Sequence, residues 1–254
     1  MGQFICAMTY PELRDALNQN SIVLLPVGGG SKEHGYHLPM GTDWFVANYL
    51  AKKLTERCNV LTLPTVPYGY FPLFVNWEGT VSIESQHFID FIKDIILSYA
   101  RFGVRKFFIL DDGVTTHFPL TIASQTLNND HGLKVAVSNI NGVGIDKLRE
   151  LVEQERGTHA DELETSMMLK IRPDLVAMEK AEEEYRHLFP HTFAGRQEKV
   201  FLPLDMDTAH GIYGNSKLAT PEKGEQALEA ILTDMQLFLD AFARWNIGEP
   251  FPEE

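Results

Sequence analysis

Short apolar runs alternate along this chain with longer segments in which apolar residues recur every three or four positions. The runs are typical of strands buried on both faces, and the longer segments are typical of amphipathic helices. Strands are expected at 22–27, 60–66, 106–110, 134–138 and 196–204, and helices at 9–17, 44–54, 88–102, 145–155, 160–172 and 220–243, with a turn at 128–132. This alternation predicts an α/β fold with a mainly parallel sheet and helices on both faces.

Length and composition limit the classes of protein to consider. The 254 residues contain no linker-like or repeated segment, so we expect a single domain over 1–254. The net charge of -13 argues against nucleic acid or an anionic membrane surface as partner. Cys6 and Cys58 are too few for a disulfide framework, which favours a reducing compartment. Neither a signal peptide nor an apolar run of membrane-spanning length is present, so a cytoplasmic location is expected.

The loop that follows the predicted strand 22–27 contains most of the candidate chemistry. It reads GGGSKEHGYHLPMGTD and contains Lys32, Glu33, His34, His37 and Asp43. Ligands bind at the carboxyl ends of strands in open α/β sheets, and imidazole with carboxylate is typical of a Zn or Mn site. An exposed polar loop is the simpler alternative, and Asp43 alone could equally cap the following helix.

A long segment at 67–84 is rich in aromatic residues and turns. Loops of this length in a compact domain are usually functional or disordered, and the aromatic content argues against disorder. The aromatic side chains could line a pocket over the candidate loop, or they could form a contact between subunits, which we favour slightly. The residues concerned are Tyr68, Tyr70, Phe71, Phe74 and Trp77.

The second informative segment is GTHADELETSMML, at 157–169. Its carboxylates lie in the first turn of a predicted helix, where they also interact favourably with the helix dipole. His159, at the start of this helix, is the residue that helix chemistry explains least.

These segments carry a resemblance to the creatininase (creatinine amidohydrolase) family. LPVGGGSKEHGYHLPMGTD resembles the signature loop of that family, GTHADELETSMML resembles its later HAGE-x-ETS segment, and GIYGNSKLATPEKGEQAL resembles its last Gly-rich turn and helix. The resemblance implies a three-layer α/β/α fold and a homo-oligomer, commonly a hexamer. It also implies two divalent metals bridged by an Asp, and hydrolysis of C–N bonds that are not ordinary peptides.

The same resemblance suggests roles for individual residues. His34 matches a metal-binding His, and Asp43 matches the bridging Asp. Glu162 matches a Glu that is a metal ligand in many members, and His159 matches a His beside the substrate.

The chain departs from the family pattern at two positions. Lys32 stands where the family has a Glu ligand of the first metal, although Glu33 could shift into that role. An Asn-Gly-His motif that follows the third strand of the family is here Asp-Gly-Val, at 112–114. One fixed positive charge can replace part of another. We therefore expect a single metal, Zn or else Mn, on His34, Asp43 and Glu162, with Lys32 at the lost second site.

The leading functional hypothesis is a metal-dependent hydrolase that acts on a small cyclic amide or formamide. The metal would activate water, Lys32 or the metal would polarise the substrate carbonyl, and His159 or Glu33 would transfer the proton. Hydrolysis of an oxidised cyclic polyol or keto-sugar is an alternative. A pseudoenzyme that keeps the fold for ligand binding is another, because two ligand positions are lost.

Overall fold

The structure is a computed structural model that describes residues 1–18, 20–185, 208–246 and 248–249. A five-stranded parallel sheet, in the order β1-β3-β2-β4-β5, forms its centre. These strands are β1 (Gln3–Phe4), β2 (Ile22–Val27), β3 (Val60–Thr62), β4 (Lys106–Asp111) and β5 (Lys134–Val137). A separate antiparallel pair joins β6 (Glu183–Glu184) and β7 (Gly214–Asn215).

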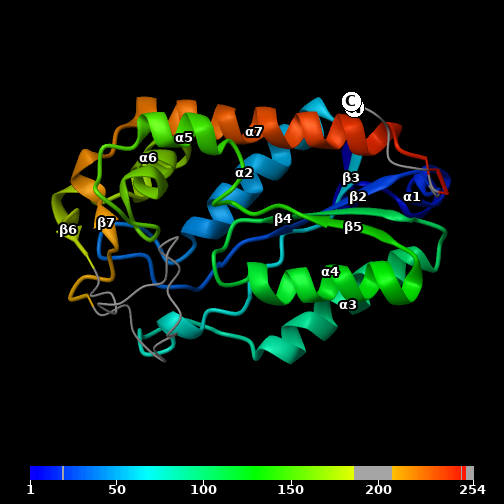
Figure 1. Ribbon diagram of the computed structural model, residues 1–254, viewed down its shortest axis with the longest axis horizontal. Helices are drawn as coiled ribbons and strands as arrows, with labels where there is room; N and C mark the ends of the chain where they lie inside the picture. Colours follow the sequence, from blue (N-terminus) through cyan, green and yellow to red (C-terminus); the bar gives the residue numbers. More distant parts are fainter. Residues whose placement is uncertain (19, 186–207, 247, 250–254) are drawn as a thin grey trace, which may run out of the picture.

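Helices cover both faces of the sheet and give three layers (Figure 1). On one side lie α2 (Thr42–Arg57), α5 (Ile145–Leu151), α6 (Glu162–Ile171) and α7 (Pro221–Arg244). On the other side lie α3 (Ser85–Ala100) and α4 (His117–His131), and α1 (Tyr10–Ala16) lies near the amino terminus. The three-layer α/β/α expectation is therefore confirmed.

The central strands divide the apolar core into two parts. Leu24 and Phe108 pack with the layer of α2 and α7, whereas Leu25 and Phe107 pack with the layer of α3 and α4. Successive side chains of a strand point to opposite faces, so a strand covered on both sides must be apolar at every position. This explains why β2 is an uninterrupted apolar run, and why β4 is apolar at 107–110, between its charged ends Lys106 and Asp111.

The register of β2 and β4 determines where polar loops gather. Ile22 pairs with Lys106 at one end, and Val27 pairs with Asp111 at the other. The two strands therefore end at the same level, and the loops that follow them share one edge of the sheet. Val66 reaches this edge through an isolated parallel bridge to Val27.

Several predicted bounds need correction. The strand predicted at 60–66 ends at Thr62, and the helix predicted at 145–155 ends at Leu151. The helix predicted from Trp44 begins at Thr42 instead. The strand predicted at 196–204 lies outside the described residues.

The sequence did not predict α4. Residues 128–131, expected in a turn, are its last residues. Only Gly132 lies beyond the helix, as its C-cap with a left-handed φ of 64°. Short 3-10 helices complete the described elements, at Ile5–Ala7, Pro72–Phe74, Pro173–Leu175, Met178–Lys180 and Ser216–Leu218. Among the described residues, no helix combines the length and apolar character needed to cross a membrane.

Candidate functional site

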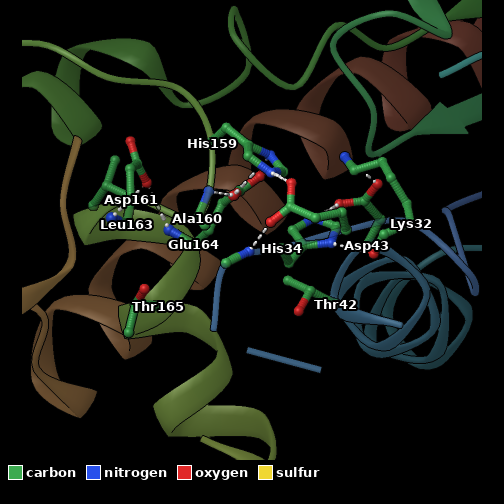
Figure 2. A network of polar contacts seen from close by, with 12 residues as sticks. Lys32, His34, Thr42, Asp43, His159, Ala160, Asp161, Leu163, Glu164 and Thr165 are labelled. Carbon is green, nitrogen blue, oxygen red and sulfur yellow. Dashed lines mark hydrogen bonds and ion pairs between the residues drawn. The ribbon is translucent and has the colours of Figure 1, made fainter. Parts of the chain in front are cut away.

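Asp43 lies at the centre of a buried polar cluster beyond the ends of β2 and β4. It belongs to the first turn of α2, whose N-cap is Gly41, so the expectation that Asp43 itself occupies the cap position is wrong. Its Oδ2 lies 2.8 Å from Lys32 Nζ, and its Oδ1 lies 2.7 Å from His34 Nε2 (Figure 2). One carboxylate thus connects a lysine and a histidine of the preceding loop.

The contacts of His34 place two electron-pair donors side by side. Its Nδ1 lies 3.1 Å from the carbonyl oxygen of Lys32, an acceptor, so this nitrogen carries the hydrogen. In a neutral ring Nε2 then has only a lone pair, which faces Asp43 Oδ1. Two such atoms repel unless they share a cation, either a proton or a metal ion.

Two aromatic residues of the long loop enclose Lys32. Its Nζ lies 5.5 Å from the ring centre of Phe71 and 5.1 Å from that of Phe74, both of which are buried. These distances allow cation–π attraction and exclude water from the ammonium group. Phe71 and Phe74 therefore line the site. A subunit contact through the exposed Tyr68 stays a prediction.

His159 forms a second pair with Glu33, at an Nε2 to Oε2 distance of 3.1 Å. The other oxygen of Glu33 accepts a hydrogen bond from the backbone N–H of Gly35. The backbone of His159 pairs with that of Tyr213 in an isolated antiparallel bridge. With Nε2–H donated to Glu33, the lone pair of His159 is on Nδ1, 4.0 Å from Glu164 Oε2.

Glu164 approaches the cluster from the start of α6 (Figure 2). Asp161 is the N-cap of this helix and accepts hydrogen bonds from the N–H groups of Leu163 and Glu164. The Glu164 side chain turns back toward the helix start, where its Oε2 accepts from Ala160 N at 2.5 Å. Ala160 has a left-handed φ of 47°, which is uncommon for a residue other than glycine.

Glu162 does not reach this cluster. Its Oε2 accepts hydrogen bonds from the backbone N–H groups of Glu153 and Gln154, at 2.9 and 2.8 Å. Its Oε1 pairs with Lys223. Both oxygens are thus engaged in joining α6 to the loop before it and to α7, and Glu164 is the carboxylate that lies near His34.

The structure therefore brings together most of the residues that the sequence singled out. Lys32, Glu33, His34, Asp43 and His159 are all buried around one point, and Glu162 lies elsewhere. In the described part of the chain, His34, His159 and Glu164 are identified as a group that could hold a metal ion, with ligand atoms within 4.8 Å of one another.

Burial and neighbouring charges shift the protonation of this cluster. Burial would raise the pKa of Asp43, but Lys32 and His34 outweigh it and lower that pKa to about 2. Burial raises the pKa of Glu33 to about 7 and that of Glu164 to about 8. It lowers the pKa of His159 well below its usual value, with help from His34 and Lys32.

Two acidic residues of the site were not candidates from the sequence. Asp112 is buried after β4, and burial together with the charges of Asp43 and Glu164 raises its pKa well above the usual range. Glu164 could have been found from the Asp-x-x-Glu spacing of 161 and 164. This capping-box pattern returns the second carboxylate toward the helix start, where His159 lies.

A small cavity opens beside the cluster, with a volume of about 90 Å³. Its polar lining includes Lys32, Asp112, His159 and Glu164, and Phe74 supplies apolar surface. A substrate group in this cavity would meet an ammonium, an imidazole and two carboxylates.

Comparison with known proteins adds to this geometry. The family model described as creatininase, creatinine amidohydrolase, matches residues 7–239. The 3-dehydro-scyllo-inosose hydrolase of Thermotoga maritima is 26% identical over 281 aligned positions, which cover 100% of this chain and 88% of that protein. The creatinine amidohydrolase of Pseudomonas putida is 25% identical and covers 89% of this chain and 92% of that protein.

The solved structures agree with the fold. A crystal structure of creatinine amidohydrolase superimposes with a TM-score of 0.80 at 25% sequence identity, covering 96% of this chain and 98% of that one. A structure described as creatininase Mn superimposes with a TM-score of 0.79 at 24% identity, covering 94% of this chain and 98% of that one.

Proposed function

This chain belongs to the creatininase family of hydrolases, and on that premise we propose that it hydrolyses a small carbonyl-containing ring, with a cyclic amide as the leading substrate class. In that reaction a water oxygen adds to the carbonyl carbon, the C–N bond breaks, and the nitrogen takes up a proton. The products are a carboxylate and the released nitrogen group within one opened chain, an amine from a simple lactam or a ureido group from hydantoin. The group of two buried histidines, His34 and His159, with the half-buried Glu164 is the observation that carries this proposal.

The donor atoms of the site suit a divalent metal. Two imidazoles and a carboxylate are a ligand set of hydrolytic Zn sites, and Mn accepts similar ligands. A cation would also remove the repulsion between the lone pairs of His34 Nε2 and Asp43 Oδ1. We propose that His34, His159 and Glu164 hold one metal, with Asp43 beside it. When bound, such an ion lowers the pKa of a water molecule and polarises a carbonyl.

Lys32 supplies a second, fixed positive charge. Its ammonium faces the Asp43 oxygen that His34 does not contact, so the carboxylate lies between two cationic positions. We infer that Lys32 takes the place of a second metal. It also lines the small cavity, where it would stabilise negative charge on a substrate carbonyl oxygen.

Glu33 accounts for the movement of the proton, and it also holds His159 in place. Glu33 Oε2 holds the Nε2–H of His159 and so keeps Nδ1 directed toward Glu164. A carboxyl whose pKa is about 7 can accept and return a proton near neutral pH. Phe71 and Phe74 restrict water around Lys32, which strengthens its interaction with a substrate oxygen.

A second substrate class is an oxidised cyclic polyol. The T. maritima relative, which this chain matches over its whole length, is named for the hydrolysis of such a ring. The small cavity presents Thr115 and Thr158 as well as its charged groups, and these could hydrogen-bond ring hydroxyls.

Metal analysis and a substrate panel test the proposal together. Purified protein would be assayed with Zn²⁺ or Mn²⁺ on hydantoin, dihydrouracil, formamide and a 1,3-diketo-inositol. We expect about one metal per chain and turnover of a cyclic amide, both lost in His34→Ala and both kept in His131→Ala, an exposed control.

Other results would redirect the proposal. Turnover of the keto-polyol alone would favour the second class. Two tightly bound equivalents of metal would contradict the role of Lys32 as a replacement charge. A chain that binds no metal and turns over no substrate would be a pseudoenzyme. Assembly into a hexamer and a cytoplasmic location stay predictions.

A further inference from the structure

A second, larger cavity adjoins the catalytic cluster. It has a volume of about 630 Å³ and lies among α2, α5, α6 and α7. Asp112, Val114, Thr158 and Glu164 line both this cavity and the 90 Å³ cavity beside His159. The two spaces are therefore neighbours that share these four wall residues.

The volumes show how a substrate could be divided between the two spaces. Ligand pockets usually measure about 300–1,000 Å³, a range that includes the larger cavity but not the smaller one. The smaller cavity has room for about three water molecules, at roughly 30 Å³ each. It suits the reacting part of a substrate, and the larger cavity suits an attached group.

The wall of the larger cavity contains an apolar region formed by four helices, beside charged residues such as Arg149 and Arg156. Val46 of α2, Leu148 of α5, Met167 of α6 and Ile231 of α7 contribute to it. The smaller cavity has the reactive groups of Lys32, His159 and Glu164 together with apolar surface from Leu73 and Phe74. A substrate whose ring meets those reactive groups and whose apolar substituent contacts the four-helix region would bury apolar surface in the larger cavity.

Val114 marks the junction of the two spaces. It lines both, and 39% of the residue remains exposed although Asp112 and Gly113 before it are buried. This valine also stands where the resemblance predicted a metal-binding histidine. Its side chain therefore lies in the shared wall, where its size would limit how far a substrate extends from one cavity into the other.

We propose that the larger cavity is a substrate subsite for an apolar group, about the size of a branched aliphatic or aromatic side chain, attached to the ring that is hydrolysed beside His159. This inference rests on the proposed function and narrows its substrate class to substituted cyclic amides. It disfavours an unsubstituted polyol, which has no apolar group for this wall.

Substituted hydantoins test the subsite directly. The metal-loaded protein would be assayed on hydantoin and on 5-isobutylhydantoin, with binding of each measured by calorimetry. A single methylene in an apolar pocket changes discrimination by about tenfold or more. We therefore expect kcat/KM for the isobutyl compound to be at least about tenfold higher than for hydantoin.

Variants of Val114 distinguish an effect on the proposed subsite from an effect on folding. Val114→Trp should lower kcat/KM for the isobutyl compound by a larger factor than kcat/KM for hydantoin, and Val114→Ala should keep the advantage of the isobutyl compound. Val81→Trp is a matched control, since Val81 is 41% exposed and lines neither cavity. Should Val114→Trp fail to fold, the relative rates of Val114→Ala on isobutyl and benzyl hydantoins decide, because a smaller side chain in the shared wall favours the benzyl compound.

The failures of the two proposals are distinguishable. Hydrolysis of hydantoin with no preference for the isobutyl compound would overturn the subsite and leave the hydrolase intact. If neither compound is hydrolysed, the proposed reaction fails, and calorimetry still decides the subsite. If the isobutyl compound binds more tightly than hydantoin and this difference is lost in Val114→Trp, the subsite is supported. Equal binding of the two compounds would overturn the subsite.

Discussion

Lys32 and Asp43 form an ion pair that is almost closed to solvent. The distance from Nζ to Oδ2 is 2.8 Å, and the side chains are only 6% and 2% exposed. Removing two charges from water is costly, and their attraction offsets that cost only while both are present. Both the structure of the site and its chemistry therefore depend on this ion pair.

Replacing Lys32 with methionine should destabilise the fold strongly. The change leaves the Asp43 carboxylate buried beside His34 without its lysine, and we expect a loss of about 3–5 kcal/mol in the free energy of unfolding. Lys53→Met is the matched control. Its ion pair with Glu56, at 3.0 Å, is 34% and 49% exposed, so its loss should cost less than about 1 kcal/mol. Equal effects of the two variants in urea denaturation would contradict an enclosed pair.

Glutamine substitutions distinguish the two carboxylates of α6. Glu164→Gln should release the metal, because a neutral amide is a far weaker ligand than a carboxylate. Glu162→Gln should retain it and instead lower stability by about 1–3 kcal/mol, through its buried contacts with Lys223 and the backbone. Elemental analysis and denaturation measure the two effects, and a reversed pattern would restore Glu162 as the ligand.

His37 should make the fold sensitive to acid. It is buried, with Nε2 2.8 Å from Thr165 Oγ1, and burial followed by the charge of His34 lowers its pKa from 6.5 to about 4. Between those two values the unfolded chain binds a proton that the folded chain does not. Stability therefore falls as pH falls from 6.5 toward 4, by up to about 3 kcal/mol in total.

The His37→Asn variant isolates this contribution. Asparagine does not titrate, so the decline in the free energy of unfolding between pH 6.5 and 4 should be shallower than in the natural chain. His131→Asn, at an exposed position, should leave the slope unchanged. Parallel slopes in the natural chain and His37→Asn would show that His37 does not carry the effect.

Gly211 should be essential for the position of Glu33. Its φ of 70° is left-handed, and a Cβ atom there would overlap Oε1 of Glu33. Gly211→Ala is expected to displace the carboxylate from His159 and to lower kcat/KM by about 10- to 100-fold. Gly132→Ala, with a φ of 64° and nothing within 4 Å of the added atom, introduces similar backbone strain without that overlap. Equal activity in both variants would argue against a role of Glu33 in positioning His159.

The elements that could be predicted from the sequence are those whose residue types are determined by burial. Strands β2 and β4 are covered on both faces. Because β2 is apolar throughout and β4 is apolar at 107–110, the positions of both strands could be predicted. Helix α4 could not be, because Ser, Thr and Asn have low helix propensity and Pro119 lies in its first turn. Packing of Leu120, Ala123 and Leu127 against the sheet stabilises this helix.

The site was predictable where one loop supplies it. Lys32, Glu33, His34 and Asp43 follow a buried strand closely, and their proximity follows from that position. The choice between Glu162 and Glu164 depends instead on the Asp161 cap and on Lys223, which belongs to another helix. Spacing alone does not show which of two nearby carboxylates a distant lysine will engage.

The contact of Tyr213 with His159 also has a consequence for biosynthesis. Val137 ends the last strand of the central sheet. During synthesis, all five strands of this sheet therefore leave the ribosome long before Gly211 and Tyr213 do. Until then, Tyr213 cannot pair with the backbone of His159, and Gly211 cannot pack against the Glu33 carboxylate. Catalytic competence should therefore arise late in translation, well after the sheet has become able to form.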